Sequence, residues 1–321
     1  MVIDFSSFLQ PLSGEPHVVI VLGKGGVGKT SVSLTIASEL SELSDTLLVS
    51  FDPAKHIMEY LDLREPMKVV KVRGRLHACQ LDIDLAAKEI TSKYVDLLNE
   101  ILPSLSVLNL EDVVKTMKYA PGVEEEVFLK RLLDIYRRSE FKYVVIDTPP
   151  TGISLRTLAL PKLYMIWVEK LIEVRERIVS LRYVIAKTLG RKYEVDDPAL
   201  KKLYEIREDY KYLNEVLKDF SRTSYVVVAN PEPLPVHEMK EVISFLEGEL
   251  RVKPKLLVLN KVLPKEVAVK LGVYEQQIKY VNEVGSMPYK SIMVGYLSNA
   301  PSKLDDIVKL KEASTVLRGG G

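Results

Sequence analysis

The chain has 321 residues, of which 47% are hydrophobic and 28% are charged, and its formal net charge is +1. This is typical of a globular protein built on one large α/β domain with or without an insertion. The near-neutral charge argues against a nucleic-acid partner, and no apolar run reaches the roughly 20 residues of a membrane span. The N-terminus carries Asp4 and no basic region typical of a secretory signal, so we expect a cytoplasmic protein.

Cysteine occurs once, at Cys79. No disulfide can form within the chain, and even a symmetric dimer would offer only two thiolates, so we expect no zinc. The residue lies in LHACQLDID, which alternates like a β-strand, and we expect it to be a small buried side chain.

Short runs rich in β-branched residues predict buried strands, with helical stretches between them. Strands this apolar on both faces are typical of a parallel sheet covered by helices, so the sequence predicts an α/β fold with a doubly wound, mostly parallel sheet. The predicted strands are 18–22, 46–51, 143–146, 225–229 and 256–259, and two of the predicted helices are 31–42 and 237–249.

A phosphate-binding motif follows the first predicted strand. Residues 23–30 read GKGGVGKT, which matches G-x-x-x-x-G-K-[ST] between a strand and a helix. Its glycines let backbone N–H groups point at phosphate oxygens, Lys29 would contact the β- and γ-phosphates, and the Thr30 hydroxyl would bind Mg²⁺. The predicted nucleotide-binding residues here are Gly23, Lys24, Gly25, Gly26, Val27, Gly28, Lys29, Thr30 and Ser31.

Lys24 stands directly after the first glycine of the motif. A second lysine in this place marks the deviant P-loop class, in which it reaches across a dimer to the partner's nucleotide. We therefore interpret Lys24 as a catalytic residue of a homodimer, the alternative being a solvated surface lysine.

Two long helical blocks, at about 86–138 and 162–220, interrupt the alternation of strands and helices. We predict a single P-loop domain over 1–321 with these blocks as a discontinuous, inserted α-helical subdomain. Within the second block, two narrow apolar seams have coiled-coil spacing and can bury each other in an antiparallel hairpin. The seams are Trp167, Leu171, Val174, Ile178, Leu181 and Ile185, and Leu203, Ile206, Tyr210, Leu213, Leu217 and Phe220.

Further motifs follow in a characteristic order. They read SFDPAK at 50–55, APGVEEEVFL at 120–129, DTPPTGISLR at 147–156, NPEPLP at 230–235 and LLVLNKVLP at 256–264. Together with GKGGVGKT they resemble the family of the arsenite-pump ATPase (ArsA) and of the ATPases that target tail-anchored membrane proteins. The resemblance spans most of the chain and implies Mg²⁺-dependent hydrolysis of ATP to ADP and phosphate.

The resemblance implies a role for each matching residue. Asp52 would orient the attacking water, with a helix N-cap before Pro53 as the structural alternative. Asp147 would hold Mg²⁺ directly or through water, with a capped turn as the alternative. Residues 148–152 would form the second switch.

Asn260 would contact the base, the alternative being a turn residue after a strand. Guanine sites commonly pair such an asparagine with an aspartate three residues on. Here that position is Leu263, so adenine is favoured.

Three features depart from the family pattern. Pro149 and Ile153 replace the alanine and histidine usual in the second switch. The cysteines that bind zinc or arsenite in relatives are missing. The chain has a single P-loop, whereas the pump ATPase has two fused halves.

The leading hypothesis is a homodimeric ATPase that couples hydrolysis to binding and targeting of tail-anchored, hydrophobic helical clients, with a membrane receptor as a further partner. The alternatives are a partner-regulated ATP switch of the partition or cell-division type, an arsenite-pump subunit, and an ATP-using metabolic enzyme. Residues singled out for a client surface are Leu105, Leu108, Val113, Met165 and Trp167.

Overall fold

The computed structural model describes residues 5–9, 15–89, 122–190, 196–297 and 303–318. These residues fall into two compact units, which are described separately. Unit 1 comprises 1–83, 134–156 and 217–321, and unit 2 comprises 84–133 and 157–216. The sequence placed the helical subdomain at about 86–138 and 162–220. Among the described residues, no helix is both long enough and apolar enough to cross a bilayer.

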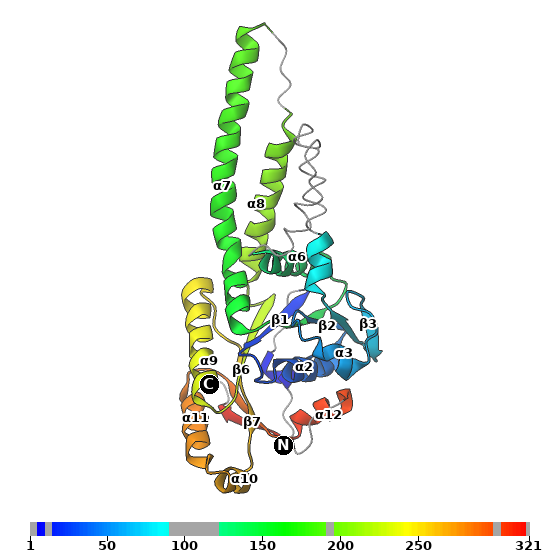
Figure 1. The fold of residues 1–321 in the computed structure, drawn as a ribbon, viewed down its shortest axis with the longest axis vertical. Helices are drawn as coiled ribbons and strands as arrows, with labels where there is room; N and C mark the ends of the chain where they lie inside the picture. Colours follow the sequence, from blue (N-terminus) through cyan, green and yellow to red (C-terminus); the bar gives the residue numbers. More distant parts are fainter. Residues whose placement is uncertain (1–4, 10–14, 90–121, 191–195, 298–302, 319–321) are drawn as a thin grey trace. The chain divides into compact units, whose positions relative to one another are not determined.

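Unit 1 is built on a mostly parallel sheet, which confirms the predicted fold class (Figure 1). The order of its nine described strands is β3-β4-β2-β5-β1-β6-β7-β8-β9, and only the edge strands β3 and β9 pair antiparallel. The strands are β1 His17–Gly23, β2 Thr46–Ser50, β3 Val70–Arg73, β4 Leu76–Gln80, β5 Tyr143–Asp147, β6 Thr223–Ala229, β7 Leu256–Val262, β8 Ser291–Gly295 and β9 Ser314–Arg318.

The five strands predicted from buried apolar runs are all present as β1, β2, β5, β6 and β7. The alternating segment around Cys79 forms β4, where this side chain is buried. The edge strands β3 and β9 were not predicted, and neither was β8. The edge sequences VKVR and STVLR carry polar or charged residues, so they lack the continuous apolar run that signals a central strand.

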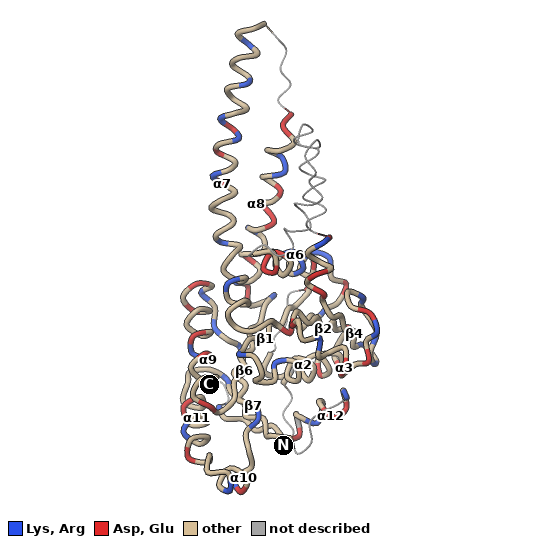
Figure 2. Tube along the Cα trace, in the orientation of Figure 1, with Lys and Arg blue, Asp and Glu red and all other residues tan. Residues whose placement is uncertain are grey.

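Helices connect the strands of unit 1 and cover the sheet. Their bounds are α1 Phe5–Leu9, α2 Lys29–Leu43, α3 His56–Leu61, α9 Pro233–Phe245, the π-helix η2 Leu246–Leu250, α10 Lys265–Lys270, α11 Tyr274–Ser286, α12 Leu304–Val308 and the 3₁₀ turn η3 Lys309–Lys311. Acidic and basic residues are interspersed along these helices, in keeping with the near-neutral net charge (Figure 2).

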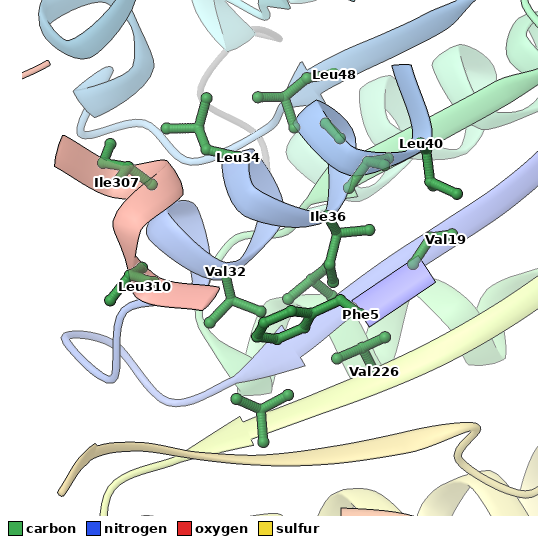
Figure 3. Close-up of a cluster of buried hydrophobic side chains, with 14 of the residues drawn as sticks. Phe5, Val19, Val32, Leu34, Ile36, Leu40, Leu48, Val226, Ile307 and Leu310 are labelled. Carbon is green, nitrogen blue, oxygen red and sulfur yellow. The ribbon is translucent and has the colours of Figure 1, made fainter. Parts of the chain in front are cut away.

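The main core lies around α2, which is buried on nearly every side. The sheet covers one side of this helix, while α1 and α12 cover others (Figure 3). Phe5 of α1 packs with Val32 and Ile36 of α2, and Ile307 of α12 lies near Leu34. Burying this helix on several sides fixes its amino end, where the phosphate motif lies.

Among the described residues of unit 2, residues 84–89 are helical and three further helices have defined bounds. They are α6 Val123–Arg138, which ends in unit 1, α7 Thr151–Thr188, which begins there, and α8 Pro198–Val216. The sequence placed the start of the second helical block at Lys162, after Pro161. The helix in fact begins at Thr151 and continues through Pro161, because a proline removes one backbone donor without breaking every helix.

The prediction that the two apolar seams bury each other is wrong for α7. The α7 seam is exposed, with exposed fractions of 37–63% from Trp167 to Ile185. Its contacts with α8 come from another face, where the Tyr164 and Tyr210 rings meet edge to face at 4.9 Å. On that face Arg175 donates three hydrogen bonds of 2.8–3.1 Å to Asp197, just before α8.

The buried residues of α7 follow this second face. Val168, Ile172 and Val179 are buried, and helical spacing places them on the same side as Tyr164 and Arg175. A specific polar anchor and an aromatic pair therefore set the rotation of α7. A prediction from the spacing of apolar residues alone places the wrong face of α7 against α8.

Candidate nucleotide site

The phosphate motif lies between β1 and α2, at the carboxyl edge of the parallel strands. Gly23 and Gly28 have positive φ angles of 152° and 93°. A Cβ at Gly23 would lie 2.3 Å from the carbonyl oxygen of Val228, and one at Gly28 would lie 2.3 Å from Nδ2 of Asn260. Only glycine fits at both positions. The loop leads into the positive end of α2, which suits a bound phosphate.

The end of β7 holds this loop from the side. Asn260 donates from Nδ2 to the carbonyl oxygen of Val27 at 2.8 Å, and Lys261 donates from Nζ to that of Gly26 at 2.7 Å. Lys261 has a positive φ of 58° and lies where the pairing of β7 with β8 shifts register. Lys261 was assigned no role from the sequence, although it follows Asn260 directly.

Two hydroxyl side chains meet at Asp147, the last residue of β5. Thr30 Oγ1 donates to Asp147 Oδ2 at 2.8 Å, and Ser50 Oγ donates to the same oxygen at 3.1 Å. The other oxygen, Oδ1, is buried and has no hydrogen-bond partner among the described residues. Burial raises the pKa of Asp147 to about 6, while the hydrogen bond from Thr30 and the charge of Lys29 oppose the rise.

Lys29 lies close to this group on the first turn of α2. Burial lowers the pKa of its ammonium group, and the nearby carboxylates of Asp147 and Asp52 oppose that change. Its Nζ donates to the carbonyl oxygen of Lys24 at 3.2 Å. A buried cation with one neutral acceptor suits a site that receives anionic oxygens.

Thr30 and Asp147 fit a magnesium ion. Hydroxyl and carboxylate oxygens are its preferred ligand types, and the buried Oδ1 of Asp147 lacks the partner that a dication would provide. The described residues contain no cluster of three or more His, Cys, Asp or Glu side chains. Mg²⁺ commonly keeps waters and phosphate oxygens as its other ligands.

Asp52 follows β2 and closes a turn. Its Oδ1 accepts a hydrogen bond from the backbone N–H of Ala54 at 2.9 Å, and its carbonyl oxygen accepts one from Gln80 Nε2 at 3.0 Å. The alternative of a helix N-cap is wrong, because α3 begins only at His56. The half-buried side chain of Asp52 lines the cavity described below.

Lys24 points toward α9 of its own chain. Its Nζ lies 3.3 Å from Oε1 of Glu238, and both side chains are partly exposed. Glu238 was not singled out from the sequence, because nothing local connects a residue in α9 with the phosphate motif.

A cavity of about 340 Å³ opens beside the loop, at the lower end of the size range of small-molecule sites. Of the predicted residues, it is lined by Gly26, Gly28, Lys29, Thr30, Ser31, Asp52 and Asn260. Its other walls were not foreseen and come from distant segments. They are His56, Tyr60, Lys261, Gly295, Tyr296, Leu297 and Leu310.

The predicted client surface is only partly described. Leu105, Leu108 and Val113 lie outside the described residues. Met165 is half-buried in α7, and Trp167 is exposed.

Comparison with known proteins identifies the family of this chain. The sequence model of the family described as anion-transporting ATPase (ArsA_ATPase) matches residues 16–318. A relative from Aquifex aeolicus (strain VF5), named "Putative arsenical pump-driving ATPase 2", is 30% identical over 85% of this chain and 93% of its own length. The ATPase GET3B of Arabidopsis thaliana is 29% identical over 81% of this chain and 67% of its own.

A third relative, the ATPase ASNA1 homolog of Dictyostelium discoideum, is 23% identical over 93% of this chain and 88% of its own. The family match covers both the phosphate loop and the strand ends that surround it. The chain therefore belongs to the ArsA family of anion-transporting ATPases and is an ATP hydrolase.

Proposed function

We propose that this ATPase is Mg²⁺-dependent and homodimeric, and that its cycle controls the binding of hydrophobic helical segments of client proteins in the cytosol for delivery to a membrane receptor. The observation that supports client binding is the exposed apolar face of α7. The site in unit 1 supports the metal and the choice of base.

At the nucleotide site, the backbone of the phosphate loop and Lys29 would bind the phosphates. Thr30 and Asp147 would hold Mg²⁺, which would neutralise phosphate charge. Asp52, whose Oδ1 accepts the hydrogen bond from Ala54, would orient the attacking water with its other carboxylate oxygen. Positioning is the main requirement of phosphoryl transfer, so a half-buried carboxylate is adequate.

Adenine is favoured by the hydrogen bonding of Asn260. Its amide nitrogen is used by Val27, so the oxygen remains to meet the base. That oxygen is buried and has no hydrogen-bond partner among the residues described. Adenine offers an amino donor where guanine offers a carbonyl acceptor, so in the same pose adenine, and not guanine, would satisfy Asn260 Oδ1.

The client-binding proposal rests on the proximal stripe of α7. We define this stripe as Leu163, Ile166, Trp167, Leu171 and Val174, all of which are exposed. Helical geometry places them on one broad face. An exposed apolar surface of this kind marks an interaction site more often than a solvated face.

The length of the proximal stripe is consistent with a dimer. Its 11 residue steps extend over about 17 Å, whereas a membrane-spanning client helix is about 30 Å long. One chain covers roughly half of such a helix. Two copies that align their stripes would cover it, and we propose that ATP brings about this alignment.

Pumping of arsenicals is named for a relative, and we do not extend it to this chain. Arsenic(III) prefers soft thiolate ligands in clusters. The chain has one cysteine, Cys79, and it is buried in β4.

The test is the binding of a peptide of about 20 apolar residues with and without ATP. We expect ATP-dependent binding that falls at least tenfold in the Trp167→Asp, Leu171→Asp double variant. The matched control is Val269→Asp, Leu271→Asp, which changes two exposed apolar residues near the end of α10 in unit 1. Binding that ignores both nucleotide and the α7 change would exclude client binding and favour a partner-regulated switch.

A further inference from the structure

The apolar face of α7 continues beyond the proximal stripe, but its character changes. Ile178, Leu181, Ile185 and Leu189 are exposed, and so are Tyr183 and Val184 beside them. We call residues 177–190 the distal segment. From position 180 onward almost every side chain of α7 is exposed, so this part of the helix has few packing partners among the described residues.

Charge separates the distal segment from the rest of α7. Between residues 162 and 176, acidic and basic residues are mixed, with Lys170 paired to Glu173 at 2.9 Å. Between 177 and 190 there are three basic residues and no acidic one, namely Arg177, Arg182 and Lys187. Figure 2 shows the same change, because the far end of α7 carries blue and no red.

Two of the three basic residues, Arg177 and Arg182, border the apolar ones, whereas Lys187 falls on the opposite side of the helix. At 100° per residue, Ile178, Leu181, Ile185 and Leu189 fall within an arc of about 80°. Arg177 lies beyond one side of this arc and Arg182 beyond the other. The hydroxyl of Thr188 donates to the carbonyl oxygen of Val184 at 2.9 Å, so it has a hydrogen bond that does not require water.

We propose that the distal segment docks onto a lipid bilayer surface that carries anionic headgroups. The apolar arc would enter the boundary between headgroups and acyl chains, while the flanking arginines extend to lipid phosphates. A helical client supplies an apolar surface but no negative charge, which would leave this purely basic border unused. An anionic interface satisfies both the apolar arc and its border.

The experiment uses the full chain with vesicles of phosphatidylcholine, with or without phosphatidylglycerol. We expect cosedimentation with the anionic vesicles only, decreasing as salt is raised. The Leu181→Asp, Ile185→Asp double variant should abolish binding, and Arg177→Gln, Arg182→Gln should weaken it roughly tenfold. ATP hydrolysis and the melting curve without lipid show that each variant is folded.

Two controls separate this proposal from client binding. Val269→Asp, Leu271→Asp should bind anionic vesicles like the unchanged chain. The distal double variant should also still bind the apolar peptide through the proximal stripe. Equal binding to neutral and anionic vesicles, no binding to either, or peptide binding lost with the distal change would overturn the proposal; the last result would assign the distal segment to clients.

Discussion

Burial of Asp147 favours the protonated carboxyl group, whereas binding a cation requires the ionised one. Its carboxyl group is fully buried, and burial raises its pKa to about 6 against opposing contributions from Thr30 and Lys29. The folded state therefore binds the proton more tightly than the unfolded state. The resulting stability is fully present below the unfolded pKa near 4, and it is lost as pH rises through about 6.

The raised pKa of Asp147 predicts how the Asp147→Asn substitution changes stability. Without nucleotide at pH 8, the variant should be more stable than the unchanged chain, by up to about 3 kcal/mol, because it removes a buried charge. The advantage should vanish near pH 4, where the carboxyl group is protonated in both states. Thermal melting at the two pH values measures the difference.

Magnesium with nucleotide should reverse the order of stability of the Asn variant and the unchanged chain. Mg²⁺ with a non-hydrolysable ATP analogue should raise the melting temperature of the unchanged chain at pH 8, less so at pH 5, because protons compete for Asp147. The Asn variant should show little Mg²⁺-dependent shift at either pH. Equal shifts in both proteins would remove Asp147 from the metal site.

At the scale of elements, one ion pair joins α7 to the start of α8. Asp197 accepts hydrogen bonds from Arg175 and also from the backbone N–H of Leu200 at 2.9 Å, so it caps the first turn of α8. The guanidinium group of Arg175 lowers the pKa of Asp197. The capping role and the ion pair act together at the junction of the two helices.

We expect Asp197→Ala to lower the free energy of unfolding by about 1–2 kcal/mol, since Arg175 is partly exposed and solvent weakens the pair. The neighbouring Asp196 is an internal control, because it forms an exposed ion pair with Lys201. Asp196→Ala should change stability by less than about 0.5 kcal/mol. Urea unfolding measures both, and equal losses would show that the Arg175 contact does not set the packing of α7.

At the scale of the whole molecule, the position of Lys24 bears on the dimer. Within one chain, Lys24 pairs with Glu238 of α9. If it acts on a partner's nucleotide, it must leave Glu238 when two chains meet. The pair is partly exposed, so separating it costs little, on the order of 1 kcal/mol or less.

Mixing two inactive variants tests this action between chains. Lys24→Ala and Asp52→Asn should each bind ATP and hydrolyse it slowly. In a mixed dimer, the Lys24→Ala chain keeps its own Asp52 and receives Lys24 from its partner, so one site is intact. An equal mixture should recover roughly a quarter of normal turnover, because half the dimers are mixed and each has one working site. No recovery would place Lys24 in the site of its own chain.

The sequence alone was sufficient for the parts of this protein whose chemistry is local. The phosphate loop is one contiguous motif, and the central strands are runs of buried β-branched residues, so both can be identified without distant contacts. The family resemblance rested on motifs at the strand ends, and the family match over residues 16–318 confirms it. The roles of Asp52, Asp147 and Asn260 remain predictions.

Tertiary structure decided the features that join distant segments. Tyr60, Tyr296 and Leu310 reach one cavity from three separate parts of the chain, and no local pattern relates them. The edge strands depend on pairing with neighbours more than on their own composition. The exposed face of α7 was decided by the Arg175–Asp197 contact together with the Tyr164–Tyr210 ring pair, because such directional contacts outweigh the small difference between two apolar faces of one helix.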